Sequence, residues 1–500
     1  MSDILSNLSL GFSVALSLSN LGFCLLGALL GTLIGVLPGI GPLATVAMLL
    51  PITFYLDPTT ALIMLAGIYY GAQYGGSTTA ILVNLPGESS SVVTCLDGHQ
   101  MAKQGRAGAA LAVAALGSFL AGTIATCVIV LFTPPLTLVA ESFQPAEYCS
   151  LMVFGLIAAV VLAQGSPIKA VAMVLLGLLL GIVGTDINSG ERRFTFGMIE
   201  LTDGIEFVAL AMGLFGVREI MTNLEKPSVR MTTEMIGRLW PTRDDFRRSW
   251  MPALRGTAIG SLLGVLPGGG ALLSSFASYT VEKKISRRPQ EFGHGAVEGV
   301  AGPEAANNAG AQTSFIPLLT LGIPGNALIA MMAGALMVHG IQPGPEVVRL
   351  QPALFWGLIA SMWIGNLMLL VINLPLIGIW VRLLRVPYRL LFPAILMFCA
   401  IGAFGVNNAS FDILLVAFFG VVGYGFAKIG CEPAPLILGF ILGPLFEENL
   451  RRTLLLSRGD WSVFVTRPTS LVFLLLALGL LALIISPMIR QKREEAFQED

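Results

Sequence analysis

Long blocks of apolar residues, separated by short polar turns, recur along nearly the whole chain. Five of them lie at 111–132, 151–163, 171–183, 354–375 and 470–485. A helix needs about 20 mostly apolar residues to cross a bilayer, and several of these blocks reach or approach that length. The strands of a membrane barrel would alternate in polarity instead. The pattern therefore predicts an all-α polytopic membrane protein.

A Gly-Val-Leu-Pro-Gly motif ends two of the apolar segments, first at 35–39 and again at 264–268. In both places a continuous helix would otherwise be expected to carry on. Pro lacks a backbone donor and Gly loosens a helix, so we expect both motifs to break it. Broken helices at matching positions of two hydrophobic halves are typical of a transporter's binding site.

A polar and basic segment near the middle divides the chain into two halves with similar motifs. The Pro-Gly tetrapeptide at 85–88 corresponds to the one at 323–326, and small polar residues precede each. Four such correspondences, in the same order and at nearly constant spacing between the halves, favour an internal duplication over chance similarity. We predict an N-terminal segment at 1–19, repeat 1 at 20–222, a cytoplasmic linker at 223–248, repeat 2 at 249–456, and a C-terminal transmembrane helix with a cytoplasmic tail at 457–500.

Lys and Arg residues indicate how the halves are oriented, because they concentrate in cytoplasmic loops. The loop at 56–58 has none, whereas its counterpart at 282–291 has four. Equivalent loops of opposite charge character predict opposite sides of the membrane, and therefore an inverted repeat. If the linker is cytoplasmic, the Arg pairs at 192–193 and 451–452 lie on the opposite side of the membrane. They are then exceptions to the rule that Lys and Arg concentrate in cytoplasmic loops.

Composition excludes several classes of protein. Hydrophobic residues make up 55% of the 500 residues and charged residues 12%, which excludes an ordinary soluble protein. The net charge of −1 and the lack of a basic patch give no sign of a nucleic-acid partner. The six Cys and three His residues show no metal-ligand spacing, and no nucleophile–base motif occurs. We therefore expect no enzyme, no cofactor, and no metal site apart from one for a Na⁺ ion.

Backbone groups at the breaks are the first candidates for ligand binding. Free helix N-termini attract anions, and unwound carbonyls coordinate Na⁺. The alternative is that each motif turns a hairpin at the membrane surface, but its duplication favours binding. Glu304, Asn307 and Asn308 offer side-chain ligands, unless they belong to an interfacial helix that begins at Pro303. The predicted cation-binding residues are Pro38, Gly39, Gly41, Pro267, Gly268, Gly269, Glu304, Asn307 and Asn308.

A run of hydroxyl residues before the first Pro-Gly tip is the second kind of candidate. Ser77, Thr78 and Thr79 offer uncharged donors that suit a carboxylate which must also be released. The alternative is helix packing or back-bonding to a carbonyl. We expect the tips at 84–88 and 322–326 to meet near the bilayer midplane around an anion. The predicted substrate-binding residues are Ser77, Thr78, Thr79, Asn84, Pro86, Gly87, Gln312, Thr313, Pro324, Gly325 and Asn326.

Taken together, these motifs resemble the large membrane subunit of the bacterial tripartite tricarboxylate transporters. The resemblance covers nearly the whole chain, with matching segments at 35–42, 69–71, 74–79, 85–88, 97–98, 303–308, 321–325, 339–340 and 343–345. It implies a multi-pass protein of the bacterial cytoplasmic (inner) membrane that imports citrate-like di- or tricarboxylates. It also implies coupling to Na⁺ or H⁺, a small membrane subunit, and a periplasmic substrate-binding protein that delivers the substrate.

A passive carboxylate permease or channel is the alternative function, because it would share the broken helices. No Lys or Arg adjoins the Pro-Gly motifs along the sequence, which favours anion recognition by helix dipoles, hydroxyls and a bound cation. Paired hairpin tips are usual in elevator-type transporters, so we expect, by analogy alone, that the unit carrying the tips moves against a scaffold.

Overall fold

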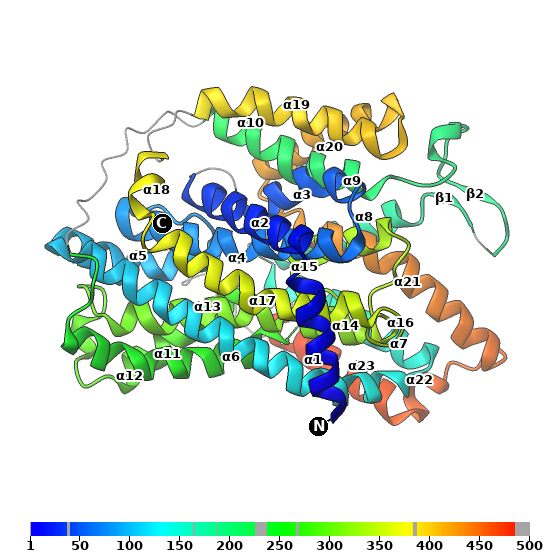
Figure 1. The fold of residues 1–500 in the computed structure, drawn as a ribbon. Coiled ribbons are helices and arrows are strands. Elements are labelled where there is room, and N and C mark those ends of the chain that lie inside the picture. Colours follow the sequence, from blue (N-terminus) through cyan, green and yellow to red (C-terminus); the bar gives the residue numbers. More distant parts are fainter. Residues whose placement is uncertain are drawn as a thin grey trace.

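The computed structural model describes residues 2–37, 41–163, 166–186, 188–225, 238–266, 270–383 and 388–485. These residues are mostly helical, with one pair of two-residue strands, which confirms the predicted all-α class (Figure 1). By length and composition, five helices among them can cross a membrane, at Leu18–Val36, Ser89–Glu141, Phe207–Glu225, Pro352–Asn373 and Ser410–Lys428. The prediction of a polytopic membrane protein is therefore confirmed.

Helices from both halves of the chain pack into one bundle, which we call the central group (Figure 1). It consists of α2 (Leu18–Val36), α3 (Pro42–Thr53), α4 (Pro58–Val83), η1 (Ser89–Ser91), α5 (Val92–Met101), α6 (Ala107–Glu141), α11 (Arg243–Gly264), α12 (Gly270–Ile285), α13 (Glu298–Thr313), α14 (Phe315–Leu321), α15 (Ala327–Val338) and α17 (Pro352–Asn373). The flanking elements are α1 (Ser2–Ala15), η2 (Ala102–Arg106), η5 (Pro289–Glu291), α16 (Pro345–Leu350) and α18 (Ile377–Leu383).

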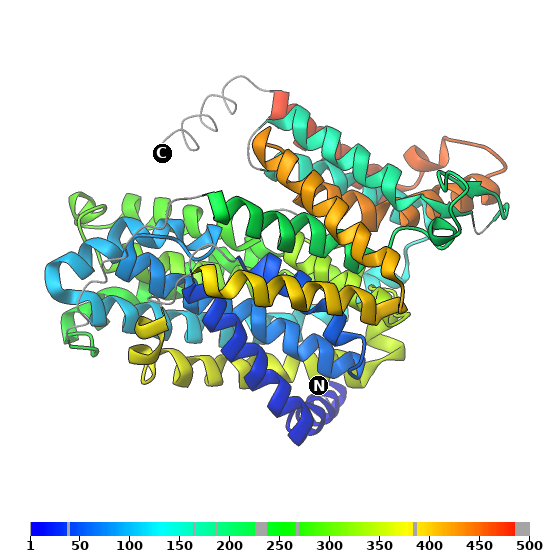
Figure 2. The same ribbon diagram turned by 90° about the horizontal axis from the view of Figure 1, so that it is seen from above.

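A second set of helices, the peripheral group, packs beside the first. It consists of α7 (Pro145–Leu162), α8 (Pro167–Gly181), η3 (Ile199–Leu201), α9 (Phe207–Ala211), η4 (Met212–Val217), α10 (Arg218–Glu225), α19 (Tyr388–Asn407), α20 (Ser410–Lys428), α21 (Ala434–Leu456), α22 (Val463–Thr466) and α23 (Pro468–Ile485). Strands β1 (Gly184–Thr185) and β2 (Arg192–Arg193) form a short antiparallel pair. α21 packs along α8, α23 along α7, and α20 along η4. In Figure 2 the helices α7, α8, α21 and α23 lie to one side of the central group.

Glycines on α2 and α11 let each helix approach a neighbour to backbone contact. A Cβ atom at Gly27, Gly31 or Gly35 of α2 would lie 2.3 Å from a carbonyl oxygen of α4. A Cβ atom at the glycines 256, 260 or 264 of α11 would lie 2.2 to 2.4 Å from a carbonyl oxygen of α13. Small residues give membrane helices this close packing. The α11 glycines correspond one for one to those of α2 under the shift in numbering that relates the two Gly-Val-Leu-Pro-Gly motifs, which supports the predicted duplication.

Two helix starts lie near the ends of predicted segments. α2 begins at Leu18, where Ser17 caps it. α11 begins at Arg243, inside the predicted linker at 223–248, because Thr242 and Asp245 form a capping box. Residues 226–237 of the linker and 486–500 of the tail lie outside the described residues. The division into inverted repeats, and their orientation, stay predictions.

Candidate functional site

Both predicted Pro-Gly tips are tight turns of the same shape. Asn84 ends α4 and Gly322 ends α14 in left-handed backbone conformations, with φ of 59° and 75°. Glycine adopts this conformation without strain, and Asn tolerates it. The next helix begins after Glu88 in the first tip and after Asn326 in the second, at φ of −146° and −154°. One shift in numbering takes Asn84 to Gly322 and Glu88 to Asn326, so equivalent residues form equivalent turns.

Each tip contacts the other half of the chain through an equivalent pair of residues. Asn307 Nδ2 donates to Glu88 Oε1 at 3.2 Å, and Asn326 Nδ2 donates to the Tyr69 hydroxyl at 3.5 Å. The shift in numbering that takes Glu88 to Asn326 also takes Tyr69 to Asn307. Swapping the two halves of the chain therefore converts one contact into the other. The helix packing shows the same relation, because η1 of the first half packs on α12 of the second, and α15 of the second half packs on α3 of the first.

The two predicted helix breaks lie beside the tips. The chain leaves helical structure between α2 and α3, and again between α11 and α12. Gly87 of the first tip packs so closely on the first break that a Cβ atom there would lie 2.2 Å from the carbonyl oxygen of Gly35. At the start of α3, the Gly41 N–H donates to Glu219 Oε1 of α10 at 2.5 Å. Pro38, Gly39, Pro267, Gly268 and Gly269, all predicted cation ligands, lie outside the described residues.

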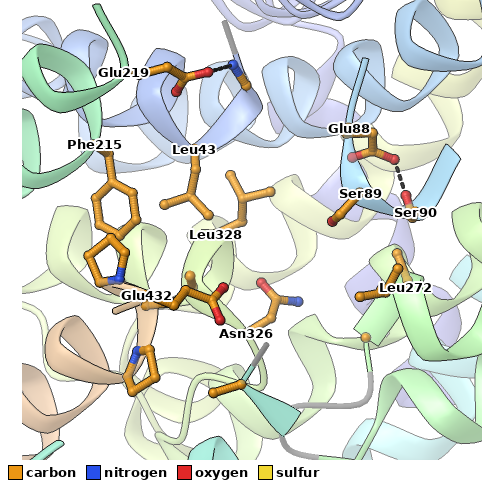
Figure 3. Close-up of a pocket in the computed structure, with 18 of the residues that line it drawn as sticks. Leu43, Glu88, Ser89, Ser90, Phe215, Glu219, Leu272, Asn326, Leu328 and Glu432 are labelled. Carbon is orange, nitrogen blue, oxygen red and sulfur yellow. Dashed lines mark hydrogen bonds between the residues drawn. The ribbon is translucent and has the colours of Figure 1, made fainter. Parts of the chain in front are cut away.

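Both tips line one cavity of about 600 Å³, a volume typical of small-ligand sites (Figure 3). Of the predicted substrate residues, Pro86, Gly87, Gly325 and Asn326 line it. Figure 3 shows Phe215 and Glu219 of the peripheral group on the side opposite Glu88 and Ser89 of the first tip. The cavity therefore lies between the two groups of helices.

Glu304 is buried in the central group, away from this cavity, and is 1% exposed. Its Oε2 accepts from Ser77 Oγ at 2.6 Å, and its Oε1 accepts from Thr94 Oγ1. In the described part of the chain, no Lys or Arg pairs with this carboxylate. α13 begins at Glu298, so the alternative of an interfacial helix that starts at Pro303 is wrong.

Amides on the same helix extend this buried polar cluster. Asn308 Nδ2 donates to Ser118 Oγ at 2.7 Å. The Oδ1 atom of Asn307 is buried and has no hydrogen-bond partner among the described residues. A second cavity of about 10 Å³, room for roughly one water molecule, lies against Ser77, Ser118 and Glu304. The cluster therefore offers a carboxylate, hydroxyls and an unused amide oxygen.

The other predicted substrate-binding residues do not line the large cavity. Thr78, Thr79 and Thr313 bond to carbonyls three or four residues earlier, which is the back-bonding alternative. Gln312 Oε1 accepts from Thr126 Oγ1 at 2.7 Å. The residues concerned are Ser77, Thr78, Thr79, Asn84, Gln312, Thr313 and Pro324.

Sequence reasoning missed several residues that line the cavity, namely Tyr69, Glu88, Arg218, Glu219 and Glu432. Glu88 is the equivalent of the predicted Asn326, so the correspondence between the halves could have found it. Arg218 and Glu432 lie far from both tips along the chain, and no local signal marks them. No Lys or Arg adjoins the Pro-Gly motifs along the sequence, but the fold brings Arg218 to the same cavity.

Known proteins place these features in context. The family described as the tripartite tricarboxylate transporter TctA family matches residues 21–438. The chain is 58% identical to an uncharacterized 52.8 kDa protein in the TAR-I ttuC' 3' region of Agrobacterium vitis, over the full length of both. An uncharacterized protein in the TAR-II ttuC' 3' region of the same organism is 61% identical over 241 residues, 48% of this chain and all of the relative. No solved structure matches the chain.

Proposed function

This chain belongs to the tripartite tricarboxylate transporter TctA family, and from that premise we propose that it imports citrate-like di- or tricarboxylates, driven by Na⁺ or H⁺. The family is one of transporters rather than of enzymes. We place the protein in the bacterial cytoplasmic membrane, where it works with a small membrane subunit. A periplasmic binding protein delivers the substrate to it.

The exchanged contacts at the tips carry this proposal. The pairs Glu88–Asn307 and Asn326–Tyr69 tie both halves of the chain to one cavity. Backbone that leaves helical structure survives at membrane depth only where it lines a cavity or is covered by protein. A ligand held between two equivalent turns can be released to either side by moving one half of its surroundings. This is the arrangement that an alternating-access carrier needs.

The cluster around Glu304 supports coupling to a cation. Oxygen ligands suit hard cations such as Na⁺, and a carboxylate also binds a proton. Glu304, Ser77 and Thr94 supply such oxygens, and polar residues form part of the lining of the small cavity beside Glu304. We assign the coupling cation to this cluster and the carboxylate substrate to the larger cavity.

A transport assay tests the proposal. The purified protein and its two partner proteins are reconstituted in liposomes, and uptake of labelled citrate and other carboxylates is measured. Gradients of Na⁺, of pH, or of neither are imposed. We expect concentrative uptake only with a gradient. If uptake without any gradient continues until the carboxylate concentrations inside and outside the liposomes are equal, the protein is a passive permease. If no carboxylate is taken up, both the ion-driven importer and the passive permease are wrong.

A further inference from the structure

Arg218 is the one Lys or Arg among the described residues that line the large cavity. It follows η4 directly, within a segment apolar enough to cross a membrane. Its Nε atom is buried and has no hydrogen-bond partner. An unused cationic donor is costly to bury, so Arg218 keeps hydrogen-bonding capacity beside the cavity that it lines.

The charges around Arg218 point to an anion as that partner. The guanidinium interacts electrostatically with Glu219 and Glu432, and Glu88 also lines the cavity. Glu219 is engaged with the Gly41 N–H at the start of α3. Three carboxylates repel an anionic substrate, and Arg218 is the cation in place to offset them. A bound anion therefore gains most from a contact with Arg218.

Arg218 and the tips belong to different groups of helices. Glu219, its neighbour in the chain, lies across the cavity from Glu88 and Ser89 (Figure 3). A guanidinium presents its N–H donors in a planar fork that matches one carboxylate. The tips contribute Ser89, Ser90 and Asn326 on their own side. An anion with a carboxylate at each end can contact both sides, whereas a monocarboxylate can contact one.

Resting on the proposed transport of carboxylates, we propose that Arg218 binds one carboxylate of the substrate while the tips bind another. Arg218 thereby selects anions with two or more carboxylates over monocarboxylates. The peripheral group then contributes a substrate-binding side chain, in addition to enclosing the cavity.

Binding to the purified full-length chain tests this role. Calorimetry compares citrate, succinate and butyrate on the wild type, Arg218→Gln and Arg218→Lys. We expect Arg218→Gln to weaken the binding of citrate and succinate by at least about 10-fold and the binding of butyrate less. Arg218→Lys keeps the charge but loses the fork, so it gives an intermediate loss. Arg452→Gln is the matched control, because Arg452 is 63% exposed, pairs with Glu448, and lies outside the cavity.

The outcomes separate this role from the proposed function. If Arg218→Gln binds citrate and succinate as tightly as the wild type does, the role of Arg218 is wrong and carboxylate transport stands. If the wild type binds no carboxylate, both are wrong. If Arg218→Gln weakens the binding of butyrate as much as that of succinate, Arg218→Lys decides between the alternatives. The role of Arg218 is wrong if this variant prefers succinate over butyrate by the same ratio of affinities as the wild type. A smaller ratio supports the role.

Discussion

Glu304 is a carboxylate held in the protein interior by hydroxyl groups. Ser77 and Thr94 donate to its two oxygens, and it is 1% exposed. An isolated charge is expensive inside a membrane protein, whereas a bound cation or proton removes that cost. This residue is therefore the most informative single position for testing the proposed coupling to a cation.

Replacing Glu304 with Gln tests that mechanism. Glutamine keeps the size of the side chain and removes its charge, so we expect gradient-driven uptake to fall at least about 100-fold, roughly 2.7 kcal/mol. Substrate binding to the purified protein changes far less, because the large cavity does not include Glu304. Glu448→Gln serves as a control at an exposed ion pair. Undiminished gradient-driven uptake by Glu304→Gln contradicts the assignment of the cation site.

Asp186, in the loop after β1, shows the opposite electrostatic setting. The Asn188 backbone N–H and the Arg451 guanidinium hold the pKa of its carboxyl down to about 2. This folded-state pKa lies below the unfolded value of about 3.9, so the charged carboxylate stabilises the loop above about pH 4. That contribution is lost as the pH falls from about 4 towards 2.

Limited digestion by pepsin measures the loss, because Phe194 and Phe196, which follow β2 directly, are exposed and Arg193 of β2 pairs with Asp186. Between pH 4 and pH 2, we expect cleavage near these residues to rise in the wild type relative to Asp186→Asn. The asparagine variant lacks the charge at both pH values, so it corrects for the activity of pepsin itself. Parallel cleavage curves for the two proteins would show that the Asp186 charge does not hold the loop.

At the scale of elements, the two tips have the same turn but different packing. A Cβ atom at Gly87 would lie 2.2 Å from the Gly35 oxygen and 2.5 Å from the Gly76 Cα atom. The nearest atom to a Cβ at Gly325 is a side-chain carbon of Pro317 at 3.8 Å. Equivalent positions therefore differ in how much space they leave.

This difference predicts unequal effects of alanine. Gly87→Ala forces the first tip away from the break, at a cost of about 1–3 kcal/mol, and we expect uptake to fall at least about 10-fold. Gly325→Ala makes only ordinary contacts, so uptake stays within about twofold of the wild type. Thermal unfolding and uptake of both variants check the prediction. Equal losses in both would mean that backbone contact at Gly87 is not what positions the tip.

The tips and breaks could be predicted from the sequence because Pro and Gly act locally. Pro86 and Pro324 cannot continue a helix, and their neighbours adopt the turns that the motif predicts. The back-bonding of Thr78 could not be distinguished from ligand binding, because both use the same hydroxyl. Arg218 could not be placed at all, since its position depends on how distant helices pack.

At the scale of the whole molecule, the large cavity lies between the central and peripheral groups. The hydrogen bond between the Gly41 N–H and Glu219 crosses this boundary. The tips, both breaks and Glu304 all belong to the central group. We propose that this group moves as a unit past the peripheral group during transport, in the manner of an elevator.

Cross-linking across the boundary tests this movement. Gly41→Cys and Glu219→Cys are combined in a chain whose six native Cys residues are replaced. A Cβ atom at Gly41 would lie 3.5 Å from the carboxylate end of the Glu219 side chain, so a short bifunctional thiol reagent can span the two Cys residues. We expect a reagent with a reducible linker to slow uptake of the double variant at least about 10-fold and a reductant to restore it, with no effect of the reagent on either single variant. Full uptake by the cross-linked protein excludes a sliding movement at this boundary.

The contacts between each tip and the other half of the chain also determine when the proposed binding site can form during synthesis. Glu88 leaves the ribosome long before Asn307, and Tyr69 long before Asn326. The first half therefore reaches the membrane with neither contact made, and both form once the second half is inserted. A product that terminates at the linker carries the first tip but not Asn307, its partner in the second half. We therefore expect such a product to hold one tip without a complete binding site.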